Sequence, residues 1–117
     1  MLVGIVGYRE FDDFILFENY ISEWELNNGK ITKIISGGCR GVDSLAKEYA
    51  QKYKIDYLEY KAEWDLYGKS AGAKRNKKIV DSCDHLVAFL SSNSLGTKIT
   101  IDMAKRSNKK VTIFDIK

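Results

Sequence analysis

The sequence contains no proline, one histidine and two cysteines among its 117 residues. Without proline, its turns depend on glycine, asparagine and aspartate, which also tolerate tight backbone bends. Cys39 and Cys83 do not form a CxxC pair, and His85 lies inside an apolar run, so the usual ligand clusters of zinc sites are absent. We therefore expect reduced thiols, no metal and no bound cofactor.

Long apolar runs are also absent, since none approaches the roughly 20 residues that a membrane-spanning helix needs. The opening stretch MLVGIVGYRE lacks the basic lead and cleavage site of a signal peptide. A hydrophobic content of 44% is typical of a folded protein and not of a disordered one. These features predict one cytoplasmic domain over residues 1–117 with no membrane partner.

The net charge of +3 is modest for a chain of this length. It permits an anionic ligand, but proteins that bind DNA tend to be more basic. The only dense basic stretch is KRNKK at 74–78. We interpret Lys77 and Lys78 there as part of a solvated helix face.

Apolar runs and helical periodicity alternate along the chain. Short apolar or alternating runs predict strands at 2–6, 33–36, 56–60, 85–90 and 110–114. Amphipathic spacing predicts four helices: one between a cap at Asp12 or Asp13 and Asn28-Gly29, one from Val42, one over about 73–82, and one ending near Asn108. The polar segment up to Gly72 is expected to be a loop.

Strands that alternate with helices predict a Rossmann-like α/β domain, in which helices cover both faces of a parallel five-stranded sheet. The strands at 2–6 and 85–90 are the most apolar and are expected in the centre, whereas those at 56–60 and 110–114 are expected at the edges. This pattern gives the order 3-2-1-4-5. Ligands of such sheets bind where the strand order reverses, beyond the carboxyl ends of the first and fourth strands.

The stretch SGGCRGVDSLA at 36–46 places three glycines between a predicted strand and a predicted helix. Glycines at such a junction let an anion such as phosphate approach the free amides of the helix N-terminus. They also serve tight turns that bind nothing. The spacing matches neither G-x-G-x-x-G nor G-x-x-x-x-G-K-[ST], so neither standard nucleotide motif applies.

Charged side chains beside these turns favour an anionic ligand. Arg9 and Arg40 are expected at the same end of the sheet, and a guanidinium group binds phosphate through two hydrogen bonds. Asp43 has alternative roles: it caps the following helix, or it contacts a ribose hydroxyl or Arg40.

The stretch AEWDLYGKSAGAKRN at 62–76 supplies the other candidates. Arg75 and Asn76 begin the buried stripe of the third helix at the ligand end, where polar groups need partners. Arg75 or Lys69 is expected to contact an anion, whereas Asn76 binds either loop backbone or the sugar. Trp64 either stacks on a base or covers the core.

These stretches, together with GYREFDD at 7–13 and LVAFLSSNSLGT at 86–97, resemble the SLOG superfamily. Within it they are most similar to the YspA-like, YpsA-related branch, small proteins common in phages and bacteria. The resemblance spans about Val3 to Ile113 and implies a Rossmann-like fold that binds a nucleotide or nucleotide-derived ligand, as a sensor or a sequestering protein. The resemblance implies that the pocket contains Gly7, Arg9, Gly37, Gly38, Arg40, Gly41, Asp43, Gly68, Gly72, Arg75, Asn76, Gly96 and Thr97. We add Ser94 as part of the wall that ends at Thr97.

Two relatives in that superfamily define alternative functions. The LOG phosphoribohydrolases carry P-G-G-x-G-T-x-x-E, and in the similar stretch SNSLGTKIT the position of their catalytic glutamate is held by Thr100. A hydrolase would therefore take its acid from Asp43, Glu63 or Asp65. DprA, whose loop resembles SGGCRGVD, binds single-stranded DNA, a function that the modest charge does not favour. The resemblance also allows a homodimer or a higher homo-oligomer.

Overall fold

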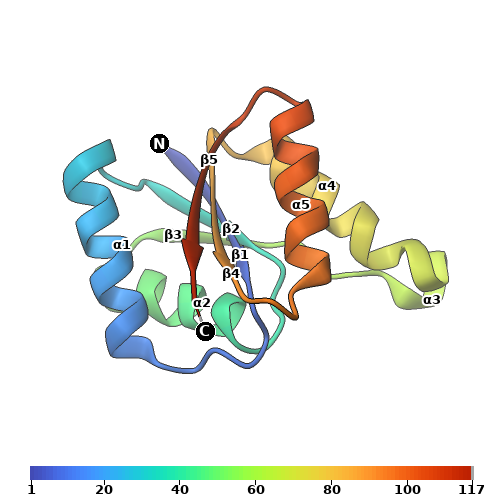
Figure 1. Cartoon of the computed structure of the whole chain (residues 1–117), viewed down its shortest axis with the longest axis horizontal. Coiled ribbons are helices and arrows are strands. Elements are labelled where there is room, and N and C mark those ends of the chain that lie inside the picture. The colour runs from blue at the N-terminus through green and yellow to red at the C-terminus, as the bar shows by residue number, and fades with distance from the viewer. Residues whose placement is uncertain (117) are drawn as a thin grey trace.

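A computed structural model describes residues 1–116 and confirms the α/β architecture (Figure 1). The elements in chain order are β1 (Leu2–Gly7), α1 (Phe14–Asn28), β2 (Lys33–Ser36), α2 (Val42–Tyr53), β3 (Asp56–Glu59), α3 (Trp64–Tyr67), the 3-10 turn η1 (Gly68–Ser70), α4 (Ala71–Ser82), β4 (His85–Leu90), α5 (Leu95–Arg106) and β5 (Lys110–Asp115). The strands form a five-stranded sheet in the order β3-β2-β1-β4-β5. Every neighbouring pair of strands is parallel, as predicted.

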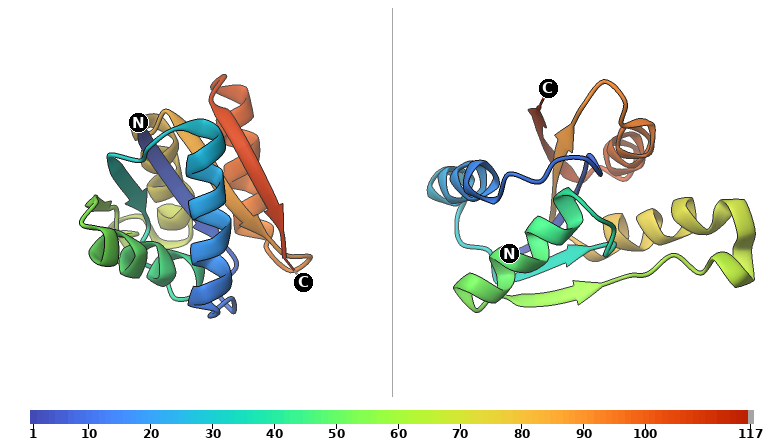
Figure 2. Two further views of the ribbon diagram at one scale, coloured as in Figure 1. Left: turned by 90° about the vertical axis from the view of Figure 1, so that its left-hand side faces the viewer. Right: turned by 90° about the horizontal axis from the view of Figure 1, so that it is seen from below.

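Helices cover both faces of the sheet, so the domain has three layers (Figure 2). On one face, α1 and α2 bury a core in which the rings of Phe17 and Phe89 stack with their centroids 5.0 Å apart. On the other face, α4 and α5 bury a smaller core around Ile79 and Leu86. The central strands β1 and β4 therefore have apolar neighbours on both sides, which explains their continuous apolar runs.

Helix α1 begins directly after Asp13, one of the two N-caps that the sequence predicted. The side chain of Asp13, rather than that of Asp12, accepts a hydrogen bond of 3.0 Å from the Leu16 amide. At the other end of the chain, α5 stops at Arg106, two residues before the predicted end near Asn108. Asn108 adopts a positive φ of 57°, which ends the helical conformation.

The segment before α4 differs from the prediction. Residues expected to form a loop up to Gly72 instead form α3 and η1, and α4 already begins at Ala71. Helix α3 has four residues, too few to show a helical period in the sequence. The segment from α3 to α4 projects beyond the rest of the molecule, as the yellow-green ribbon of Figure 2 shows. None of the helices within residues 1–116 is long and apolar enough to cross a membrane.

His85 occupies the start of β4 in a polar contact at the edge of the core. Its Nε2 lies 2.8 Å from Oγ1 of Thr112, which also accepts a hydrogen bond of 3.0 Å from the indole of Trp24. The indole and imidazole rings meet at right angles with centroids 4.9 Å apart. His85 is therefore a packing residue in this structure.

The free energy of unfolding is expected to fall as the pH drops below about 6.5, the pKa of an unperturbed histidine. Burial and the Lys110 ammonium lower the pKa of the folded His85, so in this range the unfolded chain binds a proton that the folded chain does not. Urea unfolding at about pH 7.5 and 5.5 measures this fall in the free energy of unfolding. A single titrating group can change that free energy by at most ~1.4 kcal/mol per pH unit. His85→Gln should show a smaller loss, and an equal loss would contradict this assignment.

Candidate functional site

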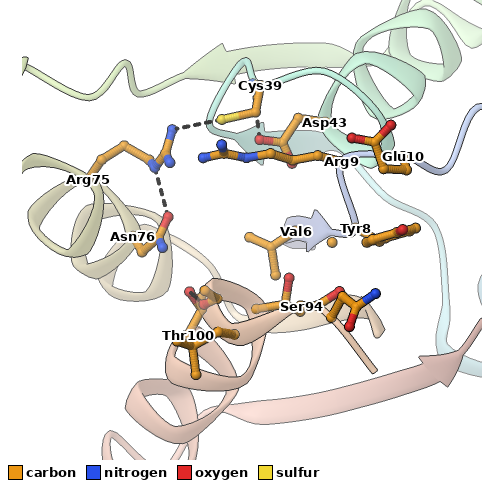
Figure 3. Close-up of a pocket in the computed structure, with 15 residues that line it drawn as sticks. Val6, Tyr8, Arg9, Glu10, Cys39, Asp43, Arg75, Asn76, Ser94 and Thr100 are labelled. Atoms are coloured by element: carbon orange, nitrogen blue, oxygen red, sulfur yellow. Dashed lines mark hydrogen bonds between the residues drawn. The ribbon is translucent and has the colours of Figure 1, made fainter. Parts of the chain in front are cut away.

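A cavity of about 460 Å³ lies at the point where the strand order reverses (Figure 3). We call it the central cavity. Its walls come from the end of β1, the turn before α2, the buried face of α4 and the start of α5. The lining residues are Val6, Gly7, Tyr8, Arg9, Glu10, Cys39, Asp43, Arg75, Asn76, Asn93, Ser94, Leu95, Gly96, Thr97 and Thr100.

A second hollow of about 470 Å³ adjoins the central cavity on the side of α3. We call it the side hollow. It is lined by Arg9, Gly37, Gly38, Cys39, Arg40, Lys61, Ala62, Trp64 and Arg75. The two spaces share Arg9, Cys39 and Arg75, so these residues lie where one space meets the other.

Arg75 is unusual for an arginine because it is only 7% exposed. Its Nε donates to Oδ1 of Asn76 at 2.7 Å, and its Nη1 donates to the carbonyl of Gly37 at 2.9 Å. Within residues 1–116, no carboxylate lies within 4.0 Å of its guanidinium group. A buried charge without an ion partner costs free energy, and a bound anion would offset that cost.

The other two predicted arginines differ from each other. Arg40 is exposed and forms an ion pair with Glu10. The guanidinium of Arg9 has no hydrogen bond or ion pair within the described part of the chain. Figure 3 shows the side chains of Arg9 and Arg75 both reaching toward the part of the cavity beside Cys39. These two cations are therefore free to share one anion.

Asp43 lies at the start of α2 with a side chain that is almost fully buried. Its Oδ2 accepts a hydrogen bond of 3.2 Å from the amide of Cys39, so it stabilises the turn before the helix. No ion pair joins it to Arg40 among the described residues, because Arg40 contacts Glu10 instead. Burial raises the pKa of Asp43 above its ordinary value, although the Cys39 amide and the charge of Arg75 oppose that effect.

Asp43→Asn is expected to stabilise the free protein at about pH 8, because ionised Asp43 is penalised by burial in the folded state and not in the unfolded one. The raised pKa also means that the contribution of Asp43 to stability is lost as the pH rises from about 3.8 through the folded pKa. Chemical unfolding of both proteins at about pH 8 measures the difference. A less stable variant would show that the charge of Asp43 stabilises the fold through Arg75.

At two of the glycines in the turn at 37–41, other parts of the chain pack so closely that a side chain would not fit. A Cβ on Gly41, which has a φ of +76°, would lie 2.4 Å from the carbonyl oxygen of Arg9. Gly38, with a φ of +72°, faces the carboxylate of Glu59 in the same way. A tight turn and close packing therefore account for both glycines, while Gly37 and Gly38 still line the side hollow.

The start of α5 forms the opposite wall of the central cavity, as predicted for Ser94 to Thr97. The Ser94 hydroxyl accepts from the amide of Ser91 at 3.1 Å and does not cap the helix. The Thr100 hydroxyl donates to the carbonyl of Gly96 at 2.9 Å. Gly96 lines this wall, and a Cβ added to it would meet no atom within 4 Å.

The structure gathers most of the predicted site residues around the two spaces. Gly7, Arg9, Asp43, Arg75, Asn76, Ser94, Gly96 and Thr97 line the central cavity, while Gly37, Gly38, Arg40 and Trp64 line the side hollow. Four predicted residues line neither: Gly41, Gly68, Lys69 and Gly72. The last three lie on η1 and at the start of α4, which project away from the sheet.

Sequence reasoning missed several residues that line these spaces. They are Val6, Tyr8, Glu10, Cys39, Lys61, Ala62, Asn93, Leu95 and Thr100. Most flank a predicted site residue in the three turns that follow β1, β2 and β4, so their position in those turns was the available signal. Of the acids considered for a hydrolase, Asp43 lines the cavity, whereas Glu63 and Asp65 are exposed and line neither space. Residues 1–116 hold no cluster of three or more metal-ligating side chains.

Comparison with known proteins identifies the family of the chain. The Gene 61 protein of Mycobacterium phage D29 is 29% identical over 87 residues, which cover 69% of this chain and 70% of the phage protein. No solved structure matches the chain. A sequence model of the YspA, cpYpsA-related SLOG family matches residues 1–67, which include β1, the glycine turn and α3. The chain therefore belongs to the YspA, cpYpsA-related SLOG family.

Proposed function

We propose that this protein binds a nucleotide or nucleotide-derived ligand at the carboxyl edge of its sheet, as a sensor or a sequestering protein. The observation that carries this proposal is Arg75, a buried guanidinium without a carboxylate partner in residues 1–116 at the junction of the two spaces. Phosphate supplies the missing negative charge, and Arg9 adds a second cation from the opposite wall. Membership of the SLOG family favours a nucleotide as the source of that phosphate.

The other polar groups fit the rest of such a ligand. Asn76 already accepts from Arg75 through Oδ1, so its amino group remains free to donate to the ligand. The Asp43 carboxylate lines the central cavity, and its two oxygens can only accept hydrogen bonds when it is ionised. Asn76 and Asp43 therefore offer one donor and one acceptor, and the two hydroxyls of a ribose can hydrogen-bond to both.

Native mass spectrometry of the purified protein tests this proposal. An intact nucleotide released on denaturation would support binding and identify the ligand class. A protein without bound ligand is then titrated with a panel of nucleoside mono- and diphosphates. The absence of any mass shift across the panel would count against the proposal and make single-stranded DNA the next probe, with steep salt dependence as its signature.

Hydrolysis of an N-glycosidic bond is a second candidate, favoured by Asp43. A buried carboxyl group with a raised pKa is the kind of group that donates a proton to a leaving base. Free base appearing from an added nucleotide would support this reaction. Asp43→Asn should then abolish release of the base and retain nucleotide binding, whereas turnover that survives in the variant would exclude Asp43 as the acid.

A further inference from the structure

The central cavity and the side hollow meet at their most cationic point. Arg9 and Arg75 belong to both spaces, and neither has a carboxylate partner within the described residues. The remaining cations of the side hollow are already paired, Arg40 with Glu10 and Lys61 with Glu59. The free positive charge is therefore concentrated between the two spaces and not at the far end of either.

The side hollow also offers an aromatic surface, which the central cavity does not share. Trp64 is 55% exposed although it is a large apolar side chain. Its ring lies along the start of α4, since a Cβ on Gly72 would be 3.5 Å from its Cη2 atom. A flat, supported and accessible indole suits stacking of a nucleobase.

The far end of the central cavity has a different chemistry. The first turn of α5 presents backbone amides and the side chains of Ser94 and Thr97 there, across the cavity from the junction. Asp43 and Asn76 add an acceptor and a donor closer to the junction, where they contact Cys39 and Arg75. Hydrogen-bonding groups of both kinds suit a group that carries several hydroxyls. Each space, at about 460 and 470 Å³, is large enough for a small organic group of its own.

We propose that the ligand has two ends joined by a diphosphate. Its base stacks on Trp64 in the side hollow, its diphosphate binds between Arg9 and Arg75, and a hydroxyl-rich second group occupies the central cavity. This inference rests on the proposed function and names the class of nucleotide: a nucleoside diphosphate that carries a sugar or similar group. A mononucleotide of the same base would leave one of the two spaces empty.

Isothermal titration with two-ended probes and their halves tests the proposal. The probes are ADP-ribose and ADP-glucose, and the halves are AMP, ribose 5-phosphate and glucose 1-phosphate. At least one two-ended probe is expected to bind about tenfold or more tightly than each of its halves, because it occupies both spaces at once. If AMP binds as tightly as both probes, the second end has no site and this inference is wrong, while the proposed function stands.

Two substitutions, one in the side hollow and one in the central cavity, test which half of the two-ended probe binds in which space. Trp64→Ala is expected to weaken AMP and the tighter two-ended probe by about tenfold and to leave the sugar phosphates unchanged. Gly96→Leu adds a large side chain at the wall of the central cavity and not of the side hollow, so it should weaken the two-ended probe but not AMP. Equal effects of both variants on every probe would overturn the two-ended arrangement. If no probe or half binds the native protein, the proposed function fails as well.

Discussion

Replacing Arg75 by methionine is expected to weaken binding of a phosphate-bearing ligand by about 100-fold or more, since a charge-assisted hydrogen bond contributes ~1.5–3 kcal/mol and phosphate accepts two from one guanidinium. Methionine has a similar length and no charge, so it fills the same space on α4. Titration of native and variant protein with ADP measures the loss. Undiminished binding would show that Arg75 is not the phosphate site.

Measuring the stability of Arg75→Met distinguishes the loss of a ligand-binding group from misfolding of the variant. Arg75→Met loses the hydrogen bonds to Asn76 and Gly37, but it also removes a buried charge that has no ion partner in the described structure. Because these two contributions oppose each other, the free energy of unfolding is expected to change by no more than about 1 kcal/mol. Arg106→Met is the matched control, because Arg106 is exposed on α5, pairs with Asp102 and lines neither space.

Gly41→Ala is expected to destabilise the protein by about 2–5 kcal/mol. The backbone of Gly41 has a φ of +76°, which costs an alanine ~1–2 kcal/mol. Its Cβ would also lie 2.4 Å from the carbonyl oxygen of Arg9 and 2.5 Å from that of Tyr8. Relief of this contact requires the turn after β1 to move away from the start of α2, which we expect to cost a further ~1–3 kcal/mol.

Gly96→Ala provides the matched control for this prediction. A Cβ on Gly96 meets no atom within 4 Å, and the residue lies inside α5, where alanine is preferred by up to about 1 kcal/mol. Thermal and urea unfolding should therefore show a large loss for Gly41→Ala and none for Gly96→Ala. Similar stabilities of the two variants would mean that the turn at Gly41 adapts to a side chain.

The sequence alone was sufficient to predict the sheet and the edge of the sheet at which the central cavity lies. Continuous apolar runs identified β1 and β4 as central, and the alternating run at 56–60 identified β3 as an edge, because burial on one or two faces leaves a local pattern. The turns after β1, β2 and β4 were predictable as cavity walls for a related reason. Parallel strands all end at the same edge of the sheet, so residues that follow them converge there.

The helical stripe of α4 also showed that Arg75 begins a buried face, which the structure confirms. The stripe did not show what Arg75 contacts. Its partners, Asn76 and the Gly37 carbonyl, come from its own helix and from a turn 38 residues earlier in the chain. The lack of a carboxylate near it in residues 1–116 depends on how every surrounding element packs, and no local pattern records that.

Tertiary structure alone decided the other features of the site. Arg40 pairs with Glu10, which lies 30 residues away in sequence. Gly41 is required by the backbone of Arg9, which belongs to the turn after β1. Helix α3 is a single short turn whose four residues carry no period. The common reason is that periodicity reports which face of an element is buried, whereas charge pairing and close backbone approach arise only when distant segments meet.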